Sequence, residues 1–167
     1  ELLPLEVVLS SLITLGTGLL AFLAASWIWL GLTPSATLLW LPVLLGLQLL
    51  WTWGLTLFLS AMQVRLRDTA HALGILLSLL LFATPVFWVP ATEVLPGIAS
   101  WMGLIEANPL HHLLNAWRGA LLPGAPASCF THSVARSVLT LVPWAGCTFF
   151  VGCAVFSASQ DRFADEV

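Results

Sequence analysis

Hydrophobic residues form long stretches that are free of charge, separated by short polar segments. No Asp, Glu, Lys or Arg occurs from Val7 to Val64, from Thr69 to Thr92, or in 137–157. A helix crosses the roughly 30 Å hydrocarbon layer of a bilayer with about 20 apolar residues. The first stretch is long enough for two such helices, and the turn-forming segment Gly-Leu-Thr-Pro-Ser at 31–35 divides it. We therefore predict four membrane-spanning helices, at about 5–30, 36–62, 69–89 and 137–157.

The segment Gln63–Asp68 is predicted to be a turn at one face of the membrane. It places Arg65, Arg67 and Asp68 between two charge-free stretches. An arginine at the centre of a bilayer costs about 2.5–3.5 kcal/mol on insertion scales. Arginines in a very short loop favour the cytoplasmic side. We predict that this turn is cytoplasmic and that the tail at 158–167 lies on the same side, two spans later.

The segment 91–135 differs in composition from the spans. Prolines interrupt it, and its apolar pieces at 98–105 and 110–122 are too short to cross a membrane. We predict short re-entrant or interfacial helices here, on the outer side. Asn108 and Pro109 mark a turn between the two pieces, and Asn108 is a candidate N-cap for the second.

Composition agrees with a membrane protein. The chain is 59% hydrophobic and 8% charged, whereas soluble domains are about 25% charged. We predict an all-α polytopic membrane protein with a single transmembrane domain, 1–167, in contact with membrane lipid. The net charge is −3 and lysine is absent, so no basic patch favours nucleic acid as a partner. The chain begins at Glu1 without the features of a signal peptide, and we expect it to lack an N-terminal part of a longer protein.

The sequence contains no pattern typical of an enzyme or a metal site. There is no Gly-rich phosphate loop, Ser/His/Asp set or pair of suitably spaced carboxylates. His111 and His112 are adjacent and point about 100° apart on a helix, which favours two interfacial polar side chains over metal ligands. The predicted spans hold no ionisable residue beyond their termini, which argues against ion coupling or hydrolysis inside them. We predict no catalytic residue, metal or cofactor in this chain, and an energy source elsewhere.

Small and polar residues inside the spans predict helix contacts. Ser10, Thr14, Thr17 and Gly18 share one face of the first span, which favours close approach of another helix. Gln48 is the lone amide of the second span. We expect it to have a protein or water neighbour rather than lipid.

Aromatic residues are abundant, with nine Trp and nine Phe but no Tyr. Anchoring at the membrane interface and helix packing explain most of them. The alternative is a stacking surface for a sugar or lipid cargo, which we consider for Phe82, Phe87 and Trp88 at the end of the third span. Pro85 lies among them and predicts a break in that helix.

Five short segments, taken in order, resemble the permease (transmembrane) subunit of type-2 ABC exporters for polysaccharides such as O-antigen, capsule and teichoic acid. The segments are Leu59–Asp68, Ala83–Phe87, Asn108–Leu110, Ala116–Leu122 and Phe163–Asp165. The resemblance implies a six-span subunit of which the four predicted spans are the third to sixth. It also implies a homodimer, each copy docked to a separate nucleotide-binding ATPase that binds ATP and Mg²⁺. Such permeases move a lipid-linked glycan outward across the bacterial cytoplasmic (inner) membrane.

The same resemblance implies roles for particular residues. The helix at 69–89 would line the substrate channel with Phe82, Phe87 and Trp88. Trp88 departs from the family, which often has tyrosine at this position, but an indole keeps a ring and a donor. The re-entrant turn at the outer end of the channel would contain Asn108, Pro109 and Arg118.

Other interpretations stay open at this point. The same fold could export a drug or a small lipid, and a non-transporting membrane protein or enzyme of glycan assembly is a further alternative. Arg65, Arg67 and Asp68 also have two interpretations. They could anchor the turn at the lipid headgroups, or form a cluster of ion pairs that couples the second and third spans to the ATPase side.

Overall fold

A computed structural model describes the whole chain except residues 1, 32–34, 67, 89–95, 123–131 and 160–167. The described residues form helices and turns and contain no strand, which confirms the all-α prediction. The elements are α1 (Leu2–Leu30), η1 (Ala36–Trp40), α2 (Leu41–Arg65), α3 (Thr69–Ala83), η2 (Pro96–Trp101), α4 (Met102–Ala107), α5 (Pro109–Leu121) and α6 (Val134–Ser157).

Three described segments are long and apolar enough to cross a membrane: Glu6–Trp29, Ala36–Val64 and Val134–Ser157. Helix α3 is shorter than the span predicted at 69–89. It has 15 residues, about 22 Å at 1.5 Å per residue. It ends before Thr84, which is extended with φ −93° and ψ 136°. The cause is Pro85, because a proline disfavours the helical conformation in the residue before it.

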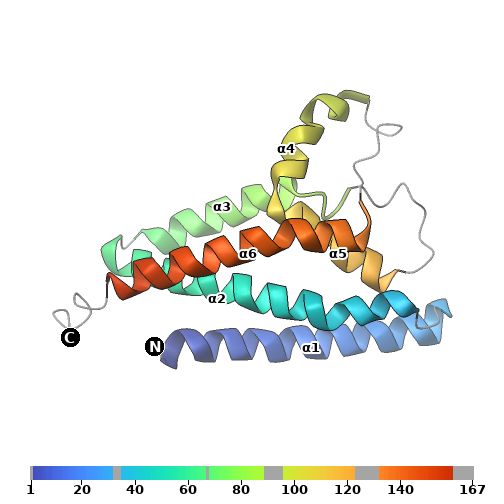
Figure 1. Ribbon diagram of the computed structural model, residues 1–167, viewed down its shortest axis with the longest axis horizontal. Helices are drawn as coiled ribbons and strands as arrows, with labels where there is room; N and C mark the ends of the chain where they lie inside the picture. Colours follow the sequence, from blue (N-terminus) through green and yellow to red (C-terminus); the bar gives the residue numbers. More distant parts are fainter. Residues whose placement is uncertain (1, 32–34, 67, 89–95, 123–131, 160–167) are drawn as a thin grey trace.

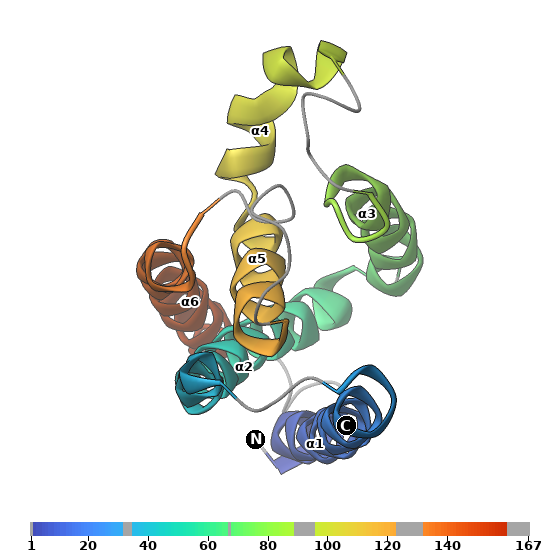
Figure 2. The ribbon, with the colours of Figure 1, turned by 90° about the vertical axis from the view of Figure 1, so that its right-hand side faces the viewer.

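The long helices run side by side in alternating directions (Figure 1). The start of α1, the α2–α3 turn and the end of α6 lie at one end of the bundle. The opposite end carries α4 and α5. Viewed from that end, α5 lies in the middle, between α6, α2 and α3, and α4 projects away from the bundle (Figure 2). We call this end of the molecule the outer end, following the predicted orientation.

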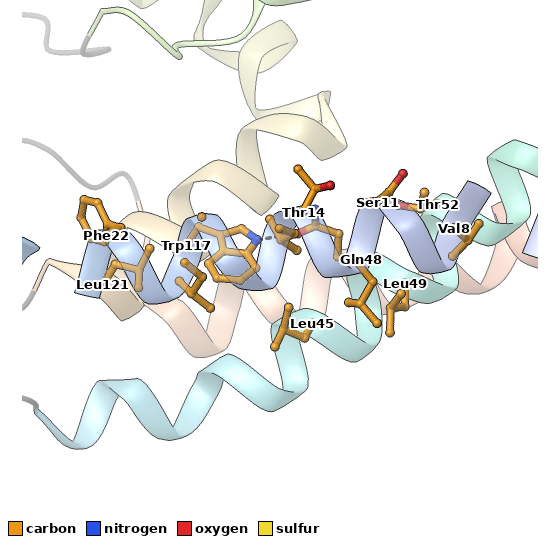
Figure 3. Close-up of a pocket in the computed structure, with 14 residues that line it drawn as sticks. Val8, Ser11, Thr14, Phe22, Leu45, Gln48, Leu49, Thr52, Trp117 and Leu121 are labelled. Atoms are coloured by element: carbon orange, nitrogen blue, oxygen red, sulfur yellow. Dashed lines mark hydrogen bonds between the residues drawn. The ribbon is translucent and has the colours of Figure 1, made fainter. Parts of the chain in front are cut away.

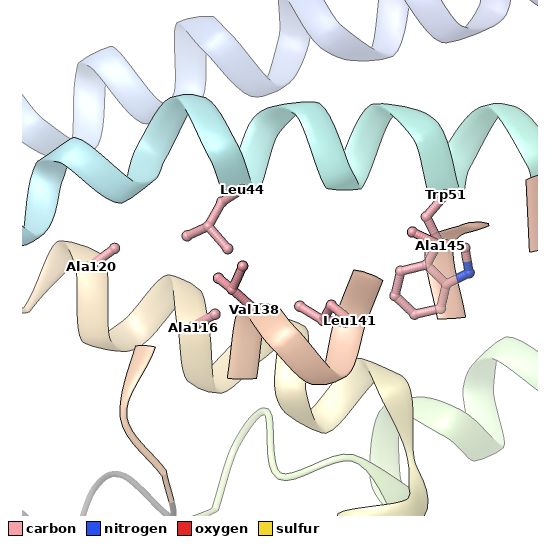
Figure 4. Close-up of a cluster of buried hydrophobic side chains, with 7 residues drawn as sticks. All are labelled: Leu44, Trp51, Ala116, Ala120, Val138, Leu141 and Ala145. Atoms are coloured by element: carbon pink, nitrogen blue, oxygen red, sulfur yellow. The ribbon is translucent and has the colours of Figure 1, made fainter. Parts of the chain in front are cut away.

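The buried core joins α2, α5 and α6. Leu44 and Trp51 of α2 lie against small residues of α5 and against α6 (Figure 4). The remaining members of this core are Ala116, Ala120, Val138, Leu141 and Ala145. Alternation of large and small side chains allows the helices to interdigitate at high density. Helix α5 is therefore an integral part of the packing, although it is too short to span a membrane.

Helices α2 and α6 approach each other closely at two glycines. A Cβ atom built on Gly54 would lie 2.6 Å from Cα of Phe149, and one built on Gly152 would collide with the carbonyl oxygen of Gly54. Glycine permits such close backbone approach, as is common between membrane helices. The predicted close approach on the small face of α1 is not observed, because a Cβ on Gly18 would meet nothing within 4 Å. The tight helix contact lies elsewhere in the bundle.

Large apolar side chains cover the outside of the bundle. Trp29 is 85% exposed and Ile28 is 73% exposed, and none of the described residues of α3 is buried. An apolar surface of this extent marks contact with membrane or protein rather than water. The molecule is therefore a multi-pass membrane protein.

Candidate functional site

Helix α5 begins at a well-formed cap. The side-chain Oδ1 of Asn108 accepts a hydrogen bond from the backbone N–H of Leu110 at 2.9 Å, and Pro109 occupies the first helical position. A proline is favourable there because its missing N–H would have no partner within the helix. The predicted N-cap role of Asn108 is confirmed. Arg118 stands in the last turn of α5, where its charge suits the helix dipole.

The two ends of α5 hold the segment that follows α3. The amide Nδ2 of Asn108 donates to Oγ1 of Thr84 at 3.0 Å, and Nη2 of Arg118 donates to the carbonyl oxygen of Val86 at 2.8 Å. We call Thr84, Val86, Asn108 and Arg118 the α5 clamp. Thr84 is only 3% exposed, so these hydrogen bonds lie where they are strong and where loss of a partner is costly. The clamp fixes the end of α3 to the centre of the outer end.

The three aromatic residues predicted to line a channel lie on both sides of the clamp residues Thr84 and Val86: Phe82 precedes them, and Phe87 and Trp88 follow. Nε1 of Trp88 donates to the carbonyl oxygen of Phe82 at 3.3 Å. The side chains of Phe82 and Phe87 are 74% and 77% exposed, and neither residue lines a cavity described below. Contact of these rings with a cargo stays a prediction.

Two adjoining cavities lie between the helices. The larger, about 560 Å³, lies between α1, α2 and α5 and is partly open, and Figure 3 shows its lining. The second, about 430 Å³, lies between α3 and α5. Leu15, Gln48 and Trp117 border both. Cavities of about 300–1,000 Å³ that are mostly apolar with a few polar groups are typical of ligand sites, and these linings suit a hydrocarbon chain.

An interhelical hydrogen bond joins two of the residues that border both cavities. Nε1 of Trp117 donates to Oε1 of Gln48 at 2.9 Å, and the two side chains point toward each other in Figure 3. The expectation that Gln48 has a protein neighbour is confirmed. Thr14 and Gly18, predicted to pack against another helix, line the larger cavity instead.

A polar cluster is buried where α4, α5 and α6 meet. The prediction that His111 and His112 are interfacial side chains is wrong, because they are only 3% and 5% exposed. Asn115 lies beside them, and its Nδ2 donates to Oγ of Ser137 and to the carbonyl oxygen of His132, both at 2.8 Å. In the described part of the chain, no group of three or more His, Cys, Asp or Glu residues could hold a metal ion.

The predicted cytoplasmic turn is described only in part. Arg65 is the last residue of α2, and Arg67 lies outside the described residues. Asp68 is exposed at the N-cap of α3, and its side chain makes no capping hydrogen bond. Both interpretations of these charges, headgroup anchoring and coupling to the ATPase side, stay predictions.

The sequence did not predict the roles of four residues described above: Thr84 in the clamp, Trp117 beside Gln48, and Asn115 and Ser137 in the polar cluster. A signal existed for Asn115, because a polar side chain among apolar residues of a short membrane helix needs a partner. The sequence did not identify that partner, because Ser137 is 22 residues away on another helix.

The sequence is similar to three curated proteins that are each named O-antigen export system permease protein RfbA. Two are from Klebsiella pneumoniae, 24% and 25% identical over 137 and 138 residues, covering 81% of this chain and 48% of each relative. The third, from Myxococcus xanthus, is 25% identical over 167 residues, 100% of this chain and 61% of the relative. No family model and no solved structure matches. The predicted resemblance to export permeases is confirmed, and the chain spans about half to three fifths of the length of these relatives.

Proposed function

We propose that this chain forms part of the permease of an ABC exporter that moves O-antigen, or a related lipid-linked glycan, outward across the bacterial cytoplasmic membrane. The observation that carries the proposal is similarity to O-antigen export permeases over 81–100% of the chain. A separate ATPase subunit would bind ATP and Mg²⁺ and supply the energy. A second copy of the permease would complete the transport path.

The structure supports a role in transport driven from outside the membrane. The three described segments long enough to span have no Asp, Glu, Lys or Arg in their interiors. They therefore lack the buried ionisable residues that ion-coupled transporters and intramembrane hydrolases use. Phe82 of α3 and Phe87 after it are exposed, and both are available to a second copy or to cargo.

The α5 clamp offers a direct test of this function. In a strain deleted for the gene that encodes this chain, lipid-linked glycan should accumulate inside the cell, and the wild-type gene should restore surface glycan. Substitution R118M removes the donor to Val86 and should lower surface glycan several-fold, because a hydrogen bond from a charged group is worth about 1.5–3 kcal/mol. Substitution R118K keeps the charge and should restore part of it.

The matched control is Arg136, which is exposed at the start of α6. Substitution R136M should leave surface glycan near the wild-type level. Membrane abundance of each variant is measured by immunoblotting, so that loss of transport is separated from loss of protein. Unchanged surface glycan in the deleted strain, with no second exporter present, contradicts the proposal.

A biochemical experiment distinguishes an exporter from an enzyme of glycan assembly. The permease is purified with its ATPase in lipid nanodiscs, and ATP hydrolysis is measured with and without lipid-linked glycan. Stimulation by glycan supports export of that cargo. Stimulation only by a drug or a small lipid supports the alternative cargo, and glycosyl transfer without stimulation supports an enzyme.

A further inference from the structure

Three histidines and one glutamate meet at the outer end, where α4, α5 and α6 join. We call Glu106, His111, His112 and His132 the histidine cluster. Nε2 of His132 lies 3.4 Å from Oε1 of Glu106. The ring of His112 stacks on that of His132 with centroids 5.8 Å apart and an interplanar angle of 14°. The ring of His111 meets that of His112 edge to face at 5.6 Å. The ring of His112 thus lies between those of His111 and His132 in this chain of contacts.

One ring nitrogen of His112 bonds to α4. Its Nε2 lies 2.8 Å from the backbone carbonyl oxygen of Glu106. A carbonyl can only accept, so Nε2 carries the hydrogen. Its Nδ1 is buried and has no hydrogen-bond partner among the described residues. The ring of His112 is therefore held inside the junction, bonded to α4 through one nitrogen and 5% exposed.

The charges around the cluster also disfavour protonation. Arg118 on α5 and Arg136 on α6 add positive charge near His111 and His132 respectively. Glu106 on α4 is the carboxylate that opposes them in the described part of this junction. Burial, with His112 as the next cause, lowers the pKa of His111 from 6.5 to about 4. Burial and then Arg136 lower the pKa of His132.

We propose that the histidine cluster is an acid-sensitive latch, which keeps α4 packed against α5 and the start of α6 while His111 and His132 are neutral and releases α4 when they are protonated. The direction of the pH effect follows from the linkage between proton binding and packing. The packed state binds protons more weakly than an open state in which the histidines reach water, so packing is most stable above pH 6.5 and weakens as the pH falls toward 4. This inference concerns regulation of the outer end and does not depend on which cargo the protein carries.

Distance measurements on the full chain in liposomes test the latch. Spin labels are placed on G103C in α4 and L139C in α6, both exposed positions, after the native cysteines are replaced by alanine. When the pH is lowered from 8 to 5, a larger fraction of the molecules should show a longer distance between the two labels. A shift of the pKa of His111 from 6.5 to about 4 allows up to about a 30-fold rise in the ratio of open to packed molecules.

The controls separate the cluster from general effects of acid. Variants H111Q and H132Q cannot gain a charge on the replaced side chain, and each should show a smaller acid response than the wild type. His71 is exposed at the start of α3, outside the cluster, and H71Q should respond like the wild type. The proposal is overturned if the wild-type distances are the same at both pH values, or if H111Q and H132Q both keep the full response. If a variant does not insert into the membrane, the wild-type distances at the two pH values still test the proposal.

Discussion

Replacing Gly54 with alanine is expected to force α2 and α6 apart. The Cβ atom of the new residue would lie 2.6 Å from Cα of Phe149, while ordinary contacts begin at 3.4 Å. The neighbour is backbone, so no side-chain rotation relieves the overlap, and the helices must separate by about 0.8 Å. Separation loosens the contact on which the bundle depends, because small interfacial residues are what allow close packing in a membrane.

The size of the effect follows from two opposing terms. Overpacking of this kind costs about 1–3 kcal/mol. Alanine has a higher helix propensity than glycine, which returns up to about 1 kcal/mol. We expect G54A to lower the free energy of unfolding by about 1–2 kcal/mol on these figures. Variant G152A should cost at least as much, because its Cβ meets the carbonyl oxygen of Gly54.

Two glycines on the same helices serve as matched controls. A Cβ on Gly46 of α2 or on Gly146 of α6 meets nothing within 4 Å. Variants G46A and G146A should therefore be neutral or slightly stabilising, through helix propensity alone. Stability is measured by titrating the protein from mild detergent into SDS while following circular dichroism. If G54A unfolds at the same SDS fraction as G46A, the close approach of α2 and α6 is not the stabilising contact that we describe.

Two further substitutions probe hydrogen bonds of the outer end. Variant N108A removes both the cap of α5 and the bond to Thr84, and it should lower stability by about 1–3 kcal/mol in the same SDS titration. Variant N108S keeps a capping oxygen and should lose less stability. Equal losses in the two variants would contradict a capping role. Variant W117F leaves Oε1 of Gln48 without its donor and should cost about 0.5–2 kcal/mol. In a double-mutant cycle with Q48L, a coupling energy near zero would show that this bond does not contribute.

Features set by local sequence could be predicted without the structure. Charge-free stretches located the long helices, because charged groups are excluded from hydrocarbon at that depth. Pro85 predicted the end of α3, since it acts on its neighbour in the chain. Asn108 followed by Pro109 predicted the start of α5 for the same reason. Each of these signals lies within a few residues of its effect.

Contacts between distant segments could not be predicted in this way. Trp117 and Gln48 are 69 residues apart, and the sequence indicated only that Gln48 needed a neighbour. Glycines are candidates for close approach wherever they occur, yet Gly18 faces open space whereas Gly54 touches another backbone. Which candidates meet depends on the arrangement of the helices. The burial of His111 likewise depends on packing with segments distant in the sequence, which its own segment does not reveal.

The arrangement of α5 explains how the outer end could influence α3. Helix α3 has no buried residue, so its position depends strongly on the clamp bonds to Asn108 and Arg118. Segments with few buried contacts open at low free energy, and the loss of two hydrogen bonds is a large change on that scale. The same α5 carries His111 and His112 on its buried face. A shift of α5 at this junction would therefore move the end of α3, and with it Phe82 and Phe87, without any change inside the spans.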